Sequence, residues 1–117
     1  MPITARYIFT ASMDVDSDKE DLFNEVYDEE HVPMLLKVPG VISVTRLKQA
    51  PLKLSIGGEE KTVDSSAEPT YSAIYEIESP DVLTSKEWAD AIEQGRWPEQ
   101  VRPYTSNRRH TLQKAMD

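Results

Sequence analysis

The spacing of apolar residues alternates between a two-residue period and a helical period along the chain, and this alternation constrains the fold more than any other feature. Residues 3–13, 41–49, 70–78 and 104–114 alternate side to side, which predicts four β-strands. Residues 17–31 and 85–94 place apolar side chains three or four positions apart, which predicts two α-helices. The predicted order is therefore strand, helix, strand, strand, helix, strand.

The first helix contains the most informative stripe of side chains. Phe23, Tyr27 and His31 follow each other at i, i+4 spacing and share one face. Pro33 cannot donate to the carbonyl four residues earlier, so the helix must kink or restart there. Helical character continues beyond Pro33 and stops at the Pro-Gly pair 39–40.

Two split β-α-β units in this order predict an α+β, ferredoxin-like fold, β-α-β-β-α-β, with a four-stranded antiparallel sheet and both helices on one face. The 117 residues form a single predicted domain, 1–117, with an inserted hairpin arm at about 50–68 before the third strand. The other sheet face is expected to expose Tyr, Ile and Val, more than a soluble monomer normally shows. We therefore expect a homodimer through the sheet face; a helix or the arm folded over it is the competing possibility.

Composition narrows the function classes. The net charge of −8 and the pI near 4.7 disfavour nucleic acid and membrane partners, whose surfaces are anionic. Cysteine is absent, which excludes disulfides, thiolate metal sites and cysteine nucleophiles. The N-terminal segment looks like a strand and carries no long apolar run, so we expect a cytoplasmic protein.

The sequence makes no case for a metal or a cofactor. The two histidines, His31 and His110, are far apart along the chain. The acidic run at 14–21 lacks the glycine and the final glutamate of a calcium loop. Neither a P-loop nor a Gly-x-Gly-x-x-Gly motif occurs. We therefore expect no metal and no cofactor.

His31 is the main candidate for catalysis. Its imidazole titrates near neutral pH, and adjacent carboxylates at 28–30 are expected to raise its pKa. Tyr27, one turn earlier, adds a phenol, and the pair suits acid–base chemistry such as enolisation, lactone isomerisation or cyclisation. A histidine near a helix C-terminus that interacts with the last carbonyls explains the same residue without catalysis.

Arginines and aromatic residues supply candidate substrate contacts. Arg6, Arg46 and Arg108 come from three strands and would clamp a carboxylate or enolate if their faces coincide. Cross-strand pairing with glutamates is the alternative. Trp97 and Tyr104 lie in a loop and at a strand start, and we expect them to line a pocket for a small apolar or aromatic metabolite.

Two segments, FNEVYDEEHVPMLLKVPGV and GRWPEQVRPYTSNRR, carry a family resemblance. Together with the element order they resemble the dimeric α+β-barrel superfamily, and the first is similar to the EthD-like group and related uncharacterised bacterial proteins. The matching positions are Tyr27, His31, Pro33, Pro39 and Gly40. The resemblance covers nearly the whole chain except the arm, and it implies a pocket between sheet and helices or inside the barrel, with His31 near its mouth.

The superfamily includes isomerases, cyclases, cofactor-free oxygenases, haem enzymes and proteins without known activity. Its haem-binding branches are longer and no axial ligand aligns, so the resemblance does not imply haem here. We predict a cofactor-free small-molecule enzyme with His31 as proton carrier; the alternative is a non-catalytic dimeric binding or accessory protein. A concave, partly apolar cleft around His31 would favour the enzyme, and a flat, solvated surface the alternative.

Overall fold

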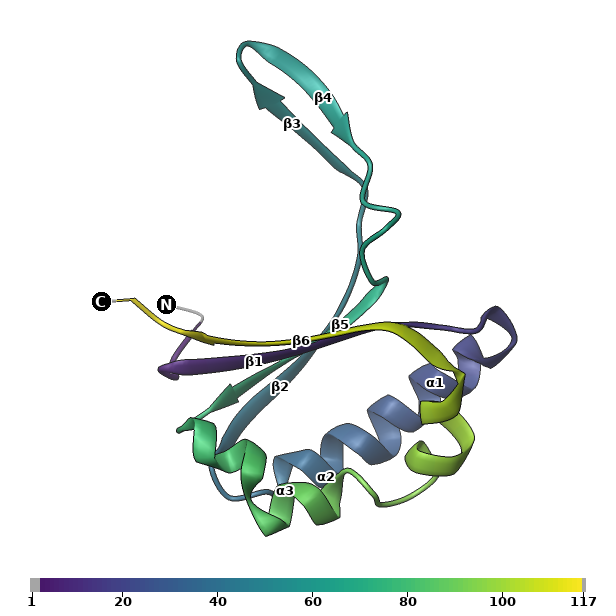
Figure 1. The fold of residues 1–117 in the computed structure, drawn as a ribbon, viewed down its shortest axis with the longest axis vertical. Helices are drawn as coiled ribbons and strands as arrows, with labels where there is room; N and C mark the ends of the chain where they lie inside the picture. Colours follow the sequence, from purple (N-terminus) through teal and green to yellow (C-terminus); the bar gives the residue numbers. More distant parts are fainter. Residues whose placement is uncertain (1–2, 117) are drawn as a thin grey trace.

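A computed structural model of the chain describes residues 3–116 (Figure 1). Its strands are β1 (Tyr7–Val15), β2 (Val41–Lys48), β3 (Leu52–Ile56), β4 (Glu59–Val63), β5 (Tyr71–Ile77) and β6 (Thr105–Lys114). Its α-helices are α1 (Glu20–Val26), α2 (Val32–Leu36) and α3 (Lys86–Ala91). Two π-helical segments, Tyr27–His31 and Trp97–Val101, and 3-10 turns at Ser17–Lys19, Pro80–Thr84 and Arg102–Tyr104 complete the order. No helix within residues 3–116 is both long and apolar enough to span a membrane.

Four strands form one antiparallel sheet in the order β2-β5-β1-β6. This is the predicted ferredoxin-like arrangement. The two strands of each β-α-β unit are not adjacent: β5 lies between β1 and β2, and β1 lies between β5 and β6. The helices lie on one side of the sheet, and the arm formed by β3 and β4 rises on the other side (Figure 1). The predicted fold class, including the hairpin inserted before the third strand of the sheet, is confirmed.

The core lies between the sheet and the helices. Alternate residues of β5, at positions 71, 73, 75 and 77, are all buried, and Ala11 and Met13 of β1 continue this surface. Phe23, Val26 and Leu35 from the helices are completely buried against it. This packing follows from the spacing of apolar residues. The two-residue alternation gives the sheet one apolar face, the helical spacing gives the helices another, and the two faces meet.

The backbone stays helical through Pro33, but its hydrogen-bond pattern changes just before that residue. The amide of Val32 donates to the carbonyl of Tyr27, five positions earlier, which is a π-type hydrogen bond. Pro33 then falls in the first turn of α2, where a missing N–H costs little. The predicted restart at Pro33 is confirmed, because α2 begins directly after the π segment, and helical backbone continues for five residues beyond His31. A position at a helix C-terminus, the non-catalytic explanation of His31, is wrong.

The open sheet face is less apolar than predicted. It carries Ile8, Thr10, Ser12, Ser72, Ile74 and Glu76 in the two central strands, all half-buried. Tyr71 and Tyr75 face the helices instead, because the alternation of β5 assigns them to the buried side. Of the predicted patch of Tyr, Ile and Val, the isoleucines are present on this face, whereas the tyrosines are not. The isoleucines alternate with hydroxyl groups. The arm does not cover this face either, since all strand residues of the arm are exposed and it extends away from the sheet (Figure 1).

Candidate functional site

The two π segments deliver three aromatic side chains to one place. Tyr27 and His31 begin and end the first segment, and Trp97 begins the second. In the second segment the amide of Arg102 donates to the carbonyl of Trp97, again five positions earlier. π segments are rare in helices and concentrate at functional sites, so two that face each other single out this region.

A glycine and an ion pair hold the second π segment against the first. Gly95 has a φ of +68°, and a Cβ there would lie 2.4 Å from Oε1 of Glu30. This close approach lets the Glu30 carboxylate accept hydrogen bonds from the Arg96 backbone amide at 2.9 Å and from Nε at 2.6 Å. The same bonds lower the pKa of Glu30. Trp97, the next residue, is thereby placed over His31.

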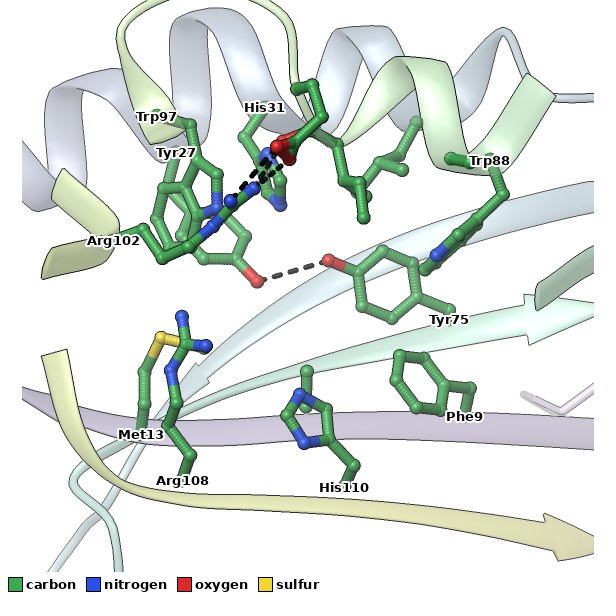
Figure 2. A pocket seen from close by; sticks show the side chains of 15 residues that line it. Phe9, Met13, Tyr27, His31, Tyr75, Trp88, Trp97, Arg102, Arg108 and His110 are labelled. Atoms are coloured by element: carbon green, nitrogen blue, oxygen red, sulfur yellow. Dashed lines mark hydrogen bonds and ion pairs between the residues drawn. The ribbon is translucent and has the colours of Figure 1, made fainter. Parts of the chain in front are cut away.

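A cavity of about 580 Å³ lies between these segments and strands β1, β5 and β6 (Figure 2). Its inner wall is buried and aromatic, formed by Tyr27, His31, Tyr75 and Trp97. Its outer residues are exposed or half-exposed and mostly charged: Glu93, Arg102, Arg108 and His110. The site is thus a concave cleft with an apolar interior and a basic rim, and His31 lies at its inner wall instead of near its mouth.

His31 is buried, neutral and incompletely hydrogen-bonded. The residue is only 6% exposed, and its ring stacks on Trp97 at 4.3 Å between centroids and meets Tyr27 edge to face at 4.9 Å. Nδ1 is buried and has no hydrogen-bond partner in the described part of the chain. Burial, and secondarily the charge of Arg102, lower the pKa of His31 to about 4. The imidazole is therefore uncharged at neutral pH.

The expectation that neighbouring carboxylates raise the pKa of His31 is wrong. Asp28 accepts a hydrogen bond from Arg46 at 2.8 Å, and Glu30 is bound to Arg96. Because successive residues of a helix point in different directions, residues 28–30 face away from the ring. The charge that acts on His31 is instead that of Arg102, which comes from the other end of the chain.

Two phenols form a second polar pair in the inner wall. The hydroxyls of Tyr27 and Tyr75 lie 3.1 Å apart and share one hydrogen bond (Figure 2). Burial raises the pKa of both phenols, so both stay protonated at neutral pH. The two hydroxyls carry two protons, and the hydrogen bond between them uses one. The other O–H can therefore donate to a bound molecule.

The rim contains one arginine that is neutralised and one that is not. Arg102 forms an ion pair with Glu93 and donates to the carbonyl of Ile92 at 2.9 Å. Arg108 donates through Nε to the hydroxyl of Thr105 at 3.0 Å, and no carboxylate of residues 3–116 pairs with it. Partial burial, and then the like charge of Arg102, lower the pKa of Arg108. Such a guanidinium is suited to an anion from outside the chain.

The structure brings four of the six predicted site residues to this cavity: Tyr27, His31, Trp97 and Arg108. It places Arg46 and Tyr104 elsewhere. Arg46 lies on β2, at the edge of the sheet opposite β6, where it binds Asn24 and Asp28. Tyr104 is exposed beneath the Lys19 ammonium, 4.6 Å from its ring centre. The arginine clamp across three strands is therefore not formed, because β2 and β6 are the two sheet edges.

Tyr75, Arg102 and His110 are among the cavity residues that sequence reasoning missed. Alternation alone signalled that Tyr75 faces the helices and that His110 shares a face with Arg108. The residue spacing did not predict that Arg102 faces the cavity, because Arg102 follows a π segment and no sequence pattern predicts such a segment. Within residues 3–116 no three His, Asp or Glu side chains come close enough together to hold a metal ion.

Comparisons with known proteins bear on the fold. No protein-family model and no curated protein sequence matches the chain. Among solved structures, an EthD-family protein from Bacillus halodurans is similar with a TM-score of 0.57 and 13% identity, over 94% of this chain and 99% of that one. The heme degrader MhuD from Mycobacterium tuberculosis, solved with two hemes bound in its active site, is similar with a TM-score of 0.58 and 13% identity, over 95% and 97%.

An MhuD mutant with two manganese protoporphyrin IX molecules per active site gives a TM-score of 0.56 at 11% identity, over 95% of this chain and 96% of that one. All three likenesses span nearly the whole length of both chains. The predicted resemblance to EthD-like α+β-barrel proteins is therefore confirmed at the level of the fold. At such low sequence identity, these similarities are evidence for the fold and not for the function.

Proposed function

We propose that the protein is a small-molecule enzyme of the isomerase, cyclase or oxygenase type, acting on a planar apolar or aromatic molecule that bears an acidic oxygen. His31 is the proposed proton carrier and Tyr27 its phenolic neighbour. The observation that carries the proposal is a buried, neutral imidazole that lines an aromatic cavity and whose buried Nδ1 has no hydrogen-bond partner among the described residues. Leaving such an atom unpaired costs about 1–3 kcal/mol, and a retained cost of this kind is typical of functional sites.

The two causes that hold His31 neutral are both sensitive to a ligand. Burial and the charge of Arg102 oppose protonation in the free protein. An anion bound between His31 and the rim arginines would offset the arginine charge and favour the imidazolium. The pKa of His31 would then rise toward neutrality, where proton transfer is most efficient. The substrate proton would pass to the imidazole and, in an isomerisation, return to another atom of the same molecule.

The rim supports the choice of an anionic group. Arg108 has no carboxylate partner in the described residues, and Arg102 lies close enough to lower its pKa. Two guanidinium groups at one side of a mainly aromatic cavity would orient a molecule with its charged end outward and its ring against Trp97.

Binding can be tested with a matched pair of probes, naphthoate and naphthamide, which differ in charge but hardly in shape. We expect naphthoate to bind more tightly, to raise the melting temperature more, and to raise the pKa of His31 measured by NMR. Arg108→Gln should remove most of the preference for naphthoate, whereas Arg46→Gln, at the opposite sheet edge, should keep it. Equal affinity for both probes would refute the anionic part of the proposal.

Proton transfer can be tested without knowing the natural substrate. Benzoylacetone carries an acidic C–H and forms an enolate, and its deuterium exchange in D₂O can be followed by proton NMR. We expect the wild-type protein to accelerate this exchange and His31→Gln to return it to the rate in buffer. Acceleration that survives His31→Gln would rule out His31 as the proton carrier, and no acceleration would favour a non-catalytic binding protein.

A second candidate function is haem binding, and the neutral state of His31 favours it. Iron binds an unprotonated ring nitrogen, which a histidine with a pKa of about 4 offers over the whole physiological range. The residues present fit the group: His31 would bind the iron, Trp97 and Tyr75 would supply aromatic contacts to the ring, and Arg102 and Arg108 would supply positive charge for its carboxylates. Haem, when bound, supplies oxygen activation or electron transfer.

Titration with haemin distinguishes the two candidates. Haem binding through His31 should shift the Soret band in the wild-type protein and in His110→Gln, but not in His31→Gln. Binding that His31→Gln leaves unaffected would exclude His31 as the ligand. A spectrum that remains that of free haemin would eliminate this candidate and leave the first one standing.

A further inference from the structure

The arm presents an apolar stripe on one of its faces. Leu52 lies opposite Val63, Leu54 opposite Lys61, and Ile56 opposite Glu59 in the register of the two strands. Residues that lie directly opposite each other share a face, so the four apolar side chains lie together. Each of them is at least 36% exposed. The other face is polar: Lys53, Ser55, Glu60 and Thr62.

Hydrogen bonds order the segment at the base of the arm that connects β4 to β5. The side-chain amide of Gln49 donates to the carbonyls of Ser65, Glu68 and Pro69 at 3.1–3.4 Å. The amide of Asn107, whose φ of +50° is rare for a residue with a side chain, donates to the carbonyl of Ala67 at 3.1 Å. An element held in this way loses less conformational entropy when it docks.

An isolated two-stranded hairpin is only marginally stable in water, so the stripe gains most if it is covered. Beyond the proposed function, and independently of it, we propose that this is a dimerisation arm whose stripe packs on a second copy of this chain. The stripe carries both Lys61 and Glu59, so a two-fold axis can bring unlike charges of two copies together.

Charge also favours a second copy as the occupant. Residues 52–63 contain two lysines and two glutamates and are neutral, whereas the whole chain has a net charge of −8. Two acidic molecules can therefore approach through their arms without the repulsion that other surfaces impose. A neutral, apolar stripe has no feature that selects a nucleic acid or an anionic membrane.

The open sheet face offers the complementary surface. It lies on the same side of the molecule as the arm (Figure 1), and Ile8 and Ile74 lie half-buried at its centre. A dimer through the sheet faces would bring the arm of each copy alongside the other copy. The open sheet face, with its mixture of isoleucines and hydroxyl groups, would form only a weak dimer contact by itself. The arms would enlarge the buried area of that contact.

Two neighbouring residues of β3 provide a matched test, since Leu54 belongs to the stripe and Ser55 to the polar face. We expect sedimentation equilibrium to show a wild-type dimer, and Leu54→Glu to raise its Kd at least about 100-fold because two leucines per dimer are lost and two charges are buried. Ser55→Glu should leave the Kd within about threefold of the wild-type value. Far-UV circular dichroism of both variants should match the wild type, because the arm lies outside the core. The melting temperature of Ser55→Glu should also match, whereas that of Leu54→Glu should fall by the amount that dimerisation contributes at the concentration used.

Hydrogen exchange supplies a measurement without substitutions. Amides of residues 52–63 should become protected as the protein concentration rises through the Kd, while amides of α3 should not change. A wild-type monomer at high micromolar concentration overturns the proposal. A Leu54→Glu dimer of wild-type affinity, or equal weakening by Ser55→Glu, overturns it as well.

Discussion

β5 and β6 both pair with β1, from opposite sides, yet the helices cover only one of them. The four helix-facing residues of β5 are at most 6% exposed. Arg108 and His110 of β6 face the same layer and remain exposed. One face of one sheet is thus divided: the half over β5 is filled and supplies stability, and the half over β6 is left open as a cavity. Substitutions in the two halves should therefore affect different properties.

The largest expected effect comes from emptying the filled half. Phe23 is completely buried and packs against the rings of Tyr27, Tyr71 and Trp97. Phe23→Ala should lower the free energy of unfolding by about 3–5 kcal/mol, as other buried phenylalanines do. Urea unfolding measured by circular dichroism would give the value. His110→Ala on β6 should cost about 1 kcal/mol or less. Equal losses would mean that the division of the sheet face does not exist.

A pH series compares the two histidines that face the cavity from opposite walls. His31 has a pKa of about 4 in the folded protein and 6.5 as its ordinary value. Because the folded-state pKa is the lower one, the unfolded chain binds the proton first as the pH falls. The contribution of His31 is complete above about pH 6.5 and is lost between pH 6.5 and 4, a change of about 3 kcal/mol.

Urea unfolding of the wild type between pH 7 and pH 4.5 should therefore show decreasing stability. His31→Gln should flatten this dependence, whereas His110→Gln should keep most of it, because the exposed ring of His110 is less desolvated. Carboxylates with lowered pKa, such as that of Glu76 at about 2, add their losses only at lower pH. A wild-type slope in His31→Gln would show that the ring is not held neutral by burial.

The shape of the cavity wall is tested by two glycines with similar backbone angles. Gly95→Ala combines a φ of +68° with a Cβ that would lie 2.4 Å from Glu30 Oε1. Gly58→Ala has a φ of +83° and nothing within 4 Å. Backbone strain alone should cost each variant about 1 kcal/mol, and the clash should add to it only at Gly95. Tryptophan fluorescence should shift in Gly95→Ala, because Trp97 follows two residues later, and stay constant in Gly58→Ala.

The division of the sheet face was only partly predictable from the sequence. Each strand keeps its two-residue period and the helix keeps its stripe, so the element order and the sides of Tyr75, Arg108 and His110 follow from local rules. The place of the helices across the sheet depends on packing between distant segments. The sequence therefore could not distinguish Arg46 at one sheet edge from Arg108 at the other.

The electrostatics of His31 show the same limit more sharply. Its neighbours in sequence are acidic, which favours a raised pKa, but Asp28 and Glu30 are bound to Arg46 and Arg96. Burial and Arg102 then act unopposed on the ring. Sequence proximity predicts charge environment only where side chains point the same way, and on a helix adjacent residues do not.

The smallest expected effect distinguishes a structural arginine from a functional one. Arg46 donates to Asn24 and Asp28 and lies over the ring of Tyr27, so Arg46→Gln should lower the free energy of unfolding by about 1 kcal/mol. Arg108 has one hydrogen bond and a like charge nearby. Arg108→Gln should therefore change stability by less than about 0.5 kcal/mol, or raise it slightly. Urea unfolding of both variants measures the difference. A larger loss of stability for Arg108→Gln would show that this arginine has a structural role. A ligand-binding role predicts that Arg108→Gln keeps its stability and loses naphthoate binding.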